Sequence, residues 1–381
     1  MERNEILIID GYALREMAEE LCRRAGLAAL IRAACPQEQP RIRIKPNLLG
    51  PIPAADGATT HPEIVEGIIC YLRGEGFSEI AVMESSWVGD RTSDSLLVTG
   101  FGNLCRRLDI PFLDLQEDRG VTADGAGMQL HVCERALESD FLINVPVLKG
   151  HCQTRMTCAL KNMKGCIPSS EKRWFHRMGL HDPIGHLSAA IRQDFIIADA
   201  VCPDLTFEDG GSPVPLNRML CALDPVLLDA YGAEAIGIPA GEVRYIATAQ
   251  ACGVGSADTK SAKISSFSEK RVEGRVCYIG SEVPELPWTR GDARSIVRLK
   301  SMVSDIDSCS ACYGALLPAL RRLEEEGILD RIRTKICIGQ GYRGRSGETG
   351  IGNCTSGFRK TLPGCPPSSE EMYKFVKKLD V

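Results

Sequence analysis

Short apolar segments alternate with amphipathic ones along this chain, and the alternation limits the folds that the chain can adopt. An apolar segment at 41–45 is followed by a loop rich in Gly, Pro and Ala, by a helical pattern that begins at Pro62, and by a second apolar segment at 79–83. Strand, helix and strand in this order form a βαβ unit, whose strands are parallel. The pattern predicts an open, mostly parallel α/β sheet with helices on both faces.

Other segments extend this pattern before it ends. We expect further strands at 6–9, 111–115, 140–145, 195–198, 243–249 and 275–280, and helices at 16–34, 96–108 and 224–236. The order loosens between Pro284 and Arg298, so residues 1–300 would form the α/β domain and residues 301–381 a small Cys-rich domain. The elements expected in this second domain are a helix at 315–329, a strand at 335–338 and a final helix capped by Ser368 and Glu371.

The composition excludes several classes of function. A net charge of −5 and 6% aromatic residues argue against a broad nucleic-acid surface, which needs basic patches and stacking side chains. No apolar run reaches the roughly 18 residues of a membrane span, and the first residues lack the features of a signal peptide. The 17 cysteines are an odd number scattered through apolar segments, which fits a reducing compartment. We therefore expect a cytoplasmic protein without nucleic-acid or membrane partners.

Four cysteines late in the chain have the spacing of metal ligands. Cys309 and Cys312 form a C-x-x-C, and Cys354 and Cys365 lie in turns rich in Gly and Pro. Such turns leave backbone N–H groups free to point at anionic sulfur, as an iron–sulfur cluster requires. A structural zinc ion uses the same thiolates, and the thiols could also stay without a ligand. We favour a [4Fe–4S] cluster, with Cys337 as the substitute if one of the four is not a ligand.

Polar residues gather where the predicted strands end, which is where open α/β sheets bind their ligands. They are Lys45, Asn47, Glu84, Ser85, Lys149, His151 and Asp199, with Thr60 and His61 at the start of a helix and Lys161, Asn162 and Lys164 after His151. The lysines predict a positive cleft that suits a carboxylate or phosphate substrate.

The residue types suggest roles in such a cleft. Lys149 and Lys161 would hold the anion, and Asn47 and Asn162 would orient it. His151 would be the general acid or base, because the unperturbed pKa of imidazole lies near neutrality.

The remaining candidates have both a functional and a structural interpretation. Lys45, Thr60 and His61 are further substrate-binding candidates, and Asp199 is a further catalytic one. Alternatively, His61 caps a helix and Asp199 holds a neighbouring loop.

No familiar catalytic motif names the reaction. The sequence has no P-loop, no dinucleotide fingerprint after the first strand and no G-x-S-x-G elbow. His176, His181 and His186 are five residues apart, a spacing that does not place them on one helical face. We expect a lid or surface loop around Trp174 and Phe175 rather than a metal site, and whether the chain is an enzyme stays open.

Several of these motifs together resemble one family. They are Lys45-Pro46-Asn47, Thr59 to Glu63, Asn144 to His151, Thr157 to Gly165, Ala198-Asp199-Ala200 and Asp224-Pro225 with Asp229-Ala230. Across roughly residues 40 to 240 the set is similar to the prokaryotic family called domain of unknown function 362. The resemblance implies no general reaction. It does imply iron–sulfur chemistry, because many members look like iron–sulfur proteins with an appended two-cluster ferredoxin.

The cysteine tail departs from that family pattern. The chain lacks C-x-x-C-x-x-C-x-x-x-C-P, so one cluster rather than two is expected. The turn Gly364-Cys365-Pro366-Pro367 resembles the last cluster-ligand segment of the small cluster-bearing subunit of respiratory complex I. That subunit has an adjacent Cys pair where this chain has C-x-x-C, so the likeness is local.

Three functions are compatible with the sequence. The first is a cytoplasmic iron–sulfur redox enzyme, an oxidoreductase that acts on a small anionic substrate bound at the strand ends. The second is a non-catalytic electron-transfer or partner-docking protein, whose partner would be a redox protein. The third is an α/β protein whose fold is stabilised by a structural zinc ion. A homodimer is compatible with each of them.

Overall fold

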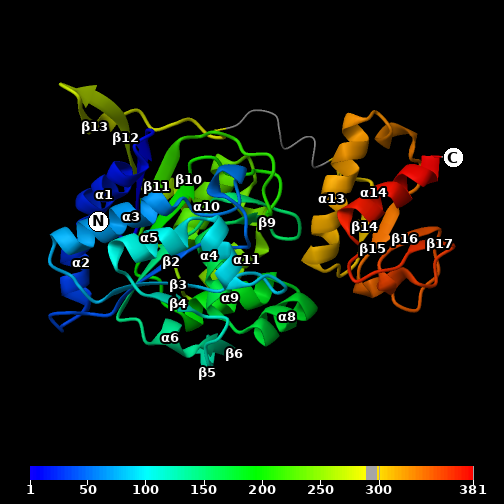
Figure 1. Cartoon of the computed structure of the whole chain (residues 1–381), viewed down its shortest axis with the longest axis horizontal. Helices are drawn as coiled ribbons and strands as arrows, with labels where there is room; N and C mark the ends of the chain where they lie inside the picture. Colours follow the sequence, from blue (N-terminus) through cyan, green and yellow to red (C-terminus); the bar gives the residue numbers. More distant parts are fainter. Residues whose placement is uncertain (289–297, 300, 381) are drawn as a thin grey trace. The chain divides into compact units, whose positions relative to one another are not determined.

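The computed structural model describes residues 1–288, 298–299 and 301–380, and the chain divides into two compact units. The first unit is Met1–Arg290 and the second is Gly291–Val381 (Figure 1). The boundary predicted near residue 300 falls beside residues that lie outside the described ranges.

The first unit contains most of the regular structure. Its strands are β1 (Glu5–Asp10), β2 (Ile42–Pro46), β3 (Ile80–Glu84), β4 (Phe112–Asp114), β5 (Gly120–Gly125), β6 (Met128–Cys133), β7 (Phe141–Val145), β8 (Lys149–His151), β9 (Arg155–Thr157), β10 (Phe195–Ala200), β11 (Arg218–Ala222), β12 (Lys263–Val272) and β13 (Arg275–Ser281). Its helices are α1 (Leu14–Ala25), α2 (Leu27–Ala34), α3 (Pro62–Gly74), α4 (Thr92–Val98), α5 (Phe101–Leu108), α6 (Glu134–Leu137), α7 (Ala159–Asn162), α8 (Ser169–Met178), α9 (His181–Ala190), α10 (Pro225–Ala235) and α11 (Arg244–Ala251).

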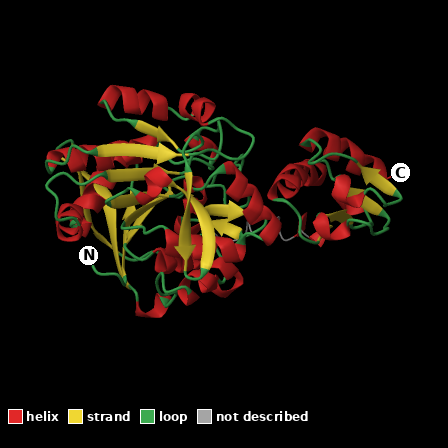
Figure 2. Ribbon diagram, turned by 90° about the horizontal axis from the view of Figure 1, so that it is seen from below, coloured by secondary structure: helices red, strands yellow, loops and turns green. Residues whose placement is uncertain are grey.

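Nine of these strands form one sheet in the order β13-β12-β1-β11-β10-β7-β2-β3-β4. The strands from β10 to β4 are mutually parallel, and β1 is parallel to β12, whereas β11 and β13 run antiparallel to their neighbours. Helices cover both faces of the sheet (Figure 2). The predicted open, mostly parallel α/β fold is confirmed.

The two faces of the sheet bury separate cores because strand side chains alternate. Ile6 and Ile8 of β1 enter one core with helices α9 to α11, and Leu7 and Ile9 enter the other with α1, α2, α3 and α5. This period of two, on strands covered on both sides, explains why the strand segments read as continuous apolar runs.

Two predicted helices are each broken by a glycine. Gly26 takes a left-handed conformation with φ 71° and ends α1, so the segment 16–34 forms α1 and α2. Gly100, with φ 83°, separates α4 from α5 in the same way. An interior glycine is free to adopt this conformation, whereas a side chain would be strained there.

Two other predictions of local structure were wrong. The segment 243–249 is not a strand but belongs to α11, in which Tyr245, Ile246 and Ala249 are buried at helical spacing. The segment around Trp174 is not a loop but helix α8. The β5–β6 hairpin and strands β11 and β12 lie where the sequence predicts no element.

The second unit is built on a four-stranded parallel sheet. Its strands, in the order β14-β15-β16-β17, are β14 (Val303–Asp305), β15 (Ile336–Ile338), β16 (Thr349–Ile351) and β17 (Lys360–Leu362). Its helices are α13 (Ser310–Glu325) and α14 (Ser369–Lys377). Ser368 and Glu371 form the capping box predicted for the final helix.

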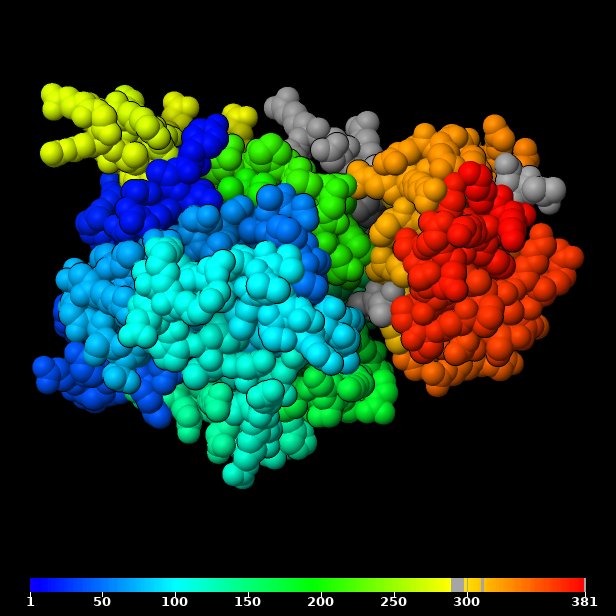
Figure 3. Space-filling view, in the orientation of Figure 1, coloured from blue at the N-terminus to red at the C-terminus, as the bar shows by residue number. Residues whose placement is uncertain are grey.

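The surface of the first unit carries a projecting hairpin. The far part of the β12–β13 hairpin extends away from the body of the unit (yellow in Figure 3), and Val272 and Ile279 are exposed on these strands. Among the described residues, no helix combines the length and the apolar character needed to cross a membrane.

Candidate functional site

Four neighbouring parallel strands bring the predicted residues together at one edge of the large sheet. Strands β10, β7, β2 and β3 lie side by side, and their carboxyl ends lead to Asp199, Lys149, Lys45 and Glu84 respectively. Asn47 follows β2 directly. Ligands of such sheets bind at this edge.

Lys45 forms a buried ion pair with Glu84. The Lys45 Nζ lies 2.6 Å from Glu84 Oε2 and also donates to the carbonyl of Pro46 at 3.0 Å. The backbone N–H of Ser85 donates to the other carboxylate oxygen at 2.8 Å. Lys45 therefore has its charge balanced within the protein.

Lys149 begins a chain of hydrogen bonds that crosses the strand ends. Its ammonium donates to Asn47 Oδ1 at 3.1 Å, and Asn47 Nδ2 donates to Asn162 Oδ1 at 2.8 Å. Asn162 Nδ2 donates to Asn144 Oδ1 at 2.7 Å, and Asn144 Nδ2 donates to Gln193 Oε1 at 2.6 Å. We call this series the amide chain; the two asparagines predicted to orient a substrate orient each other in it.

The Lys149 ammonium also donates to the carbonyls of Ala58 at 2.5 Å and Glu208 at 2.8 Å. Burial, and then the charge of Lys161, lower the pKa of Lys149 to about 7. Three oxygen acceptors nevertheless fit a protonated ammonium with three N–H donors. Lys149 therefore ties loops together and has no donor left for a ligand.

His61 and Asp199 form a second pair at this edge. The Asp199 Oδ2 accepts from both the backbone N–H and the Nδ1 of His61, each at 2.8 Å. Burial lowers the pKa of His61, but the charge of Asp199 and its hydrogen bond outweigh that effect and raise it to about 10. Asp199 thus holds the residue at which α3 begins, whereas the His61 side chain itself makes no capping hydrogen bond to the helix. The Thr60 hydroxyl is buried between the strand ends and donates to the carbonyl of Val145 at 2.8 Å.

His151 lies at the end of β8 with its ring orientation fixed. Its Nδ1 accepts from the backbone N–H groups of Gln153 at 3.0 Å and Thr154 at 3.1 Å. The ring proton of the neutral imidazole must then be on Nε2, which lies 3.5 Å from Glu208 Oε1. Burial, followed by the charge of Lys161, lowers the pKa of His151 well below its usual value.

Cys152 shares the Glu208 carboxylate with His151. Its Sγ donates to Glu208 Oε1 and its backbone N–H to Oε2, both at 2.8 Å. The ligand atoms of His151, Cys152 and Glu208 lie within 4.8 Å of one another, close enough to ligate one metal ion.

The protons around this group fit a cation poorly. A histidine that binds a metal normally donates its other ring N–H, whereas Nδ1 of His151 accepts two hydrogen bonds. The charges of Lys161 and Lys164 act on the same ring and repel a cation. Glu208 is therefore placed to exchange protons with Cys152 and His151.

Lys161 differs from the neighbouring lysines of this region in its contacts. It is half-buried, and within the described ranges its ammonium has no hydrogen bond or ion pair. Burial lowers its pKa to about 8, against the attraction of Glu208, Cys152 and Asp209. Its charge also contributes to the lowered pKa of Lys149.

Two lysines that lie beyond Lys161 complete what we call the lysine cluster: Lys45, Lys149, Lys161, Lys164 and Lys172. Lys164 lies 3.3 Å from His176 Nε2 and 5.8 Å from the ring centroid of Trp87. Lys172 of α8 donates to the carbonyls of Ser85 and Ser86 at 3.0 and 2.9 Å.

The carboxylates that act on the lysine cluster are the buried Glu84, Asp204 and Glu208 and the exposed Asp209. The five lysines outnumber these carboxylates, and burial lowers the pKa values of Lys149, Lys161, Lys164 and Lys172, which a bound anion would raise again.

Sequence reasoning missed Lys172, Cys152 and Glu208 as members of this site. Lys172 lies in a segment interpreted as a loop, whereas in α8 it is on the buried face with Glu171 and Phe175. Glu208 was named only as part of a turn that could carry a carboxylate to the cleft, and Cys152 follows His151 directly in the sequence. The apolar spacing of α8 was the one signal that could have found Lys172.

The four predicted cysteine ligands lie at the carboxyl edge of the second sheet. Cys309 follows β14 and precedes α13, and Cys312 lies in the first turn of that helix. Cys354 follows β16, and Cys365 follows β17. Because these strands are parallel, the three segments that bear the thiols emerge on the same side.

The thiols are close enough to influence one another. Burial, and then the charges of Cys309, Cys365 and Cys354, raise the pKa of Cys312 to about 12. The turns of Cys354 and Cys365 are joined by two hydrogen bonds of 2.8 Å between Asn353 and Gly364. The four side chains therefore form one group.

Two donors from the remaining strand reach this group. The Gln340 Nε2 donates to Cys309 Sγ at 3.4 Å. A hydrogen bond to Cys354 and its charge raise the pKa of Arg343. Cys337 lies within β15, so it belongs to the strand and not to the turn beyond its end.

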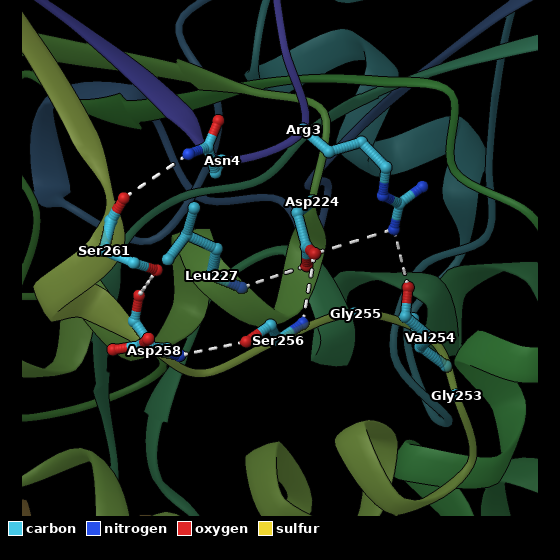
Figure 4. A pocket seen from close by; sticks show the side chains of 10 residues that line it. All are labelled: Arg3, Asn4, Asp224, Leu227, Gly253, Val254, Gly255, Ser256, Asp258 and Ser261. Carbon is cyan, nitrogen blue, oxygen red and sulfur yellow. Dashed lines mark hydrogen bonds and ion pairs between the residues drawn. The ribbon is translucent and has the colours of Figure 1, made fainter.

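A surface depression of about 480 Å³ lies elsewhere on the first unit (Figure 4). Arg3 and Ser261 line it just before β1 and β12 begin, so it is at the amino end of these parallel strands. Its polar groups bond one another: Arg3 lies 3.6 Å from Asp224 and donates to the carbonyl of Val254 at 2.8 Å. Asp224 is also the N-cap of α10. These contacts are structural.

Comparison with known proteins places this site in a family. Residues 42–234 match the family described as domain of unknown function (DUF362), which is half of the chain and includes the lysine cluster. This chain belongs to the DUF362 family. The description of this family assigns no reaction, so the site must be interpreted from its own chemistry.

Two proteins resemble parts of this DUF362 member. The thylakoid-associated protein sll1697 of Synechocystis sp. (strain ATCC 27184 / PCC 6803 / Kazusa) is 29% identical over 170 residues, which are 45% of this chain and 51% of that protein. The chain therefore spans about half the length of this curated relative. The lactate racemase apoprotein from Thermoanaerobacterium thermosaccharolyticum gives a TM-score of 0.39 at 11% identity, covering 60% of this chain and 57% of that one.

Proposed function

We propose that this DUF362 protein is an iron–sulfur protein that carries one [4Fe–4S] cluster on Cys309, Cys312, Cys354 and Cys365. The observation that carries the proposal is the meeting of four thiols at one edge of a parallel sheet. Their mutual repulsion opposes ionisation of the thiols, and a cationic metal centre would relieve it. Bound there, the cluster would supply one-electron transfer.

The spacing of the sulfurs favours a cluster over one zinc ion. With Zn–S bonds of about 2.3 Å, the ligands of a zinc ion lie about 3.8 Å apart. Among the described residues, no three of the four tail sulfurs lie within 4.8 Å of one another. Gly352 leaves room beside them, since a Cβ at this position would lie 3.7 Å from Cys312 Sγ.

The first unit would bind a small anionic substrate, a carboxylate or phosphate, at Lys161 and Lys164. The support is the excess positive charge of the lysine cluster and the unengaged ammonium of Lys161. Glu208, with His151 and Cys152 bonded to it, would exchange protons with the bound molecule. Together these features favour a redox enzyme in a reducing, cytoplasmic setting.

A non-catalytic electron carrier is the second candidate. It is favoured by the exposure of Cys365, which would let a redox partner protein approach the cluster directly. In that case the lysine cluster would bind an effector anion and not a substrate. The two candidates are distinguished by whether the cluster is reduced when a substrate anion is added. Reduction that depends on the added anion favours the enzyme over the carrier.

The first experiment is anaerobic purification with a visible spectrum and analysis of iron, sulfide and zinc. We expect a brown protein with about four irons and four sulfides per chain. Cys309→Ser and Cys365→Ser should lose most of the metal, whereas the matched control Cys337→Ser should retain it. Colourless protein with one zinc, or full metal content in both ligand variants, would contradict the proposal.

A further inference from the structure

The turn after β15 supplies no proposed ligand to the cysteine group, although the other three strands of the second sheet do. β15 is followed instead by Gln340 and Arg343. Both side chains end in N–H groups. The Gln340 Nε2 donates to Cys309 Sγ at 3.4 Å, and the exposed Arg343 interacts electrostatically with Cys354. Three strand ends thus present sulfur, and the fourth presents donors to sulfur.

The backbone holds this turn in place independently of its side chains. The N–H of Gln340 donates to the carbonyl of Asp307 and that of Gly341 to the carbonyl of Ile306, both at 3.0 Å. Gly341 has no space for a side chain, because an added Cβ would overlap Ile306. The turn is therefore fastened to the segment that leads from β14 to Cys309.

We propose that Gln340 and Arg343 set the reduction potential of the group that the four thiolates bind. This inference rests on the proposed iron–sulfur function. A cluster gains negative charge when it is reduced, and an N–H donor on a ligand sulfur stabilises the more negative state. Both residues would then raise the potential, and Arg343 would add the attraction of its full charge. They are positioning residues, not metal ligands.

The test is an anaerobic redox titration of the full-length protein, followed by its visible spectrum, with iron and sulfide measured on each sample. Gln340→Leu removes one donor, and we expect the equilibrium with a reference dye to shift about tenfold toward the oxidised cluster, about 59 mV for one electron. Gln340→Glu should shift it further, because a carboxylate adds negative charge. Arg343→Leu should lower the potential by a similar or larger amount, and this effect should shrink as salt is added.

Two variants serve as controls. Arg343→Lys keeps the charge and should show only part of the shift. Arg345→Leu makes the same change of charge two residues further on, where Arg345 acts on Tyr342, and should leave the potential unchanged.

Three results would overturn the inference. A cluster present in all variants with an unchanged potential would remove the role of both residues and leave the iron–sulfur proposal intact. Loss of iron in Gln340→Leu and in Arg343→Lys, but not in the wild type, would make the turn structural. A wild-type protein without iron would overturn the proposed function, and the inference would fall with it.

Discussion

At the scale of single residues, identical side chains have different tasks in this protein. Lys149 and Lys161 both belong to the lysine cluster, but Lys149 donates to three protein oxygens and Lys161 to none of the described residues. The distinction follows from backbone geometry, because two loops distant in the sequence bring the carbonyls of Ala58 and Glu208 to the Lys149 ammonium. From the sequence alone, both lysines are predicted to bind the anion.

Replacing these two lysines by methionine should separate the tasks. Lys149→Met leaves three buried oxygens without a donor and should cost about 3 kcal/mol of stability. Lys161→Met should change stability by less than about 0.5 kcal/mol and abolish stabilisation by phosphate or sulfate. Thermal unfolding with and without the anions checks both. Equal loss of stability, or anion stabilisation that survives Lys161→Met, would contradict the assignment.

The pair of His61 and Asp199 should make stability depend on pH. The pKa of His61 is raised from 6.5 to about 10 in the folded protein, so its contribution is complete below about pH 6.5. That contribution is lost as the pH rises through about 10. His61→Gln should cost about 2 kcal/mol at pH 6 and much less above pH 10. Melting temperatures of the two proteins across this range provide the measurement, and a constant difference would contradict the pairing.

At the scale of elements, the lysine cluster depends on close packing between the segment after α7 and the ends of two strands. The segment after α7 passes directly over the ends of β2 and β3 at Gly165. A Cβ there would overlap the Glu84 carboxylate and lie 2.7 Å from Lys45 Nζ. The ion pair of these residues needs this position to be glycine.

Gly165→Ala should therefore disrupt the buried ion pair and cost about 3 kcal/mol or more. Gly127→Ala is a suitable comparison, because Gly127 has a left-handed backbone but open space around it. It should cost only the smaller backbone strain of about 1 kcal/mol. Chemical unfolding distinguishes the two, and equal costs would mean that the crossing is looser than described.

The parallel core could be predicted from sequence because its strands are buried on both faces. β2, β3, β7 and β10 read as apolar runs that end in polar residues, and their order along the chain implies a shared edge. α11 could not be separated from a strand, since Tyr245 and Ile246 favour both structures. The hydrogen-bond partners of Lys149 and His151 depend on loops whose course no periodicity reveals.

At the scale of the whole molecule, the two proposed sites belong to different compact units. Removing the metal should therefore destabilise one unit and leave the other almost unchanged, because the binding free energy of the metal stabilises only the fold that holds it. Calorimetry under anaerobic conditions should show two transitions. Chelation of the metal should lower the midpoint temperature of the same transition that Cys309→Ser lowers. Phosphate should raise the midpoint temperature of the other transition. A single transition that responds to both treatments would contradict the separation.

The amide chain has a direction, and that direction has a consequence at its far end. Every amide in it points the same way, because Lys149 can only donate at one end and the backbone carbonyls of Pro46 and Ala159 accept from Asn162 and Asn144 further along. The series ends at Gln193, whose Nε2 is buried and has no hydrogen-bond partner within the part of the chain that the structure describes. The amide chain is therefore a series of aligned amide dipoles, and its unmatched N–H donor is at the last residue, Gln193. Without Lys149 the carbonyl of Asn47 would lose its donor, but the backbone carbonyls that accept from Asn162 and Asn144 would keep the amides further along the series in the same orientation.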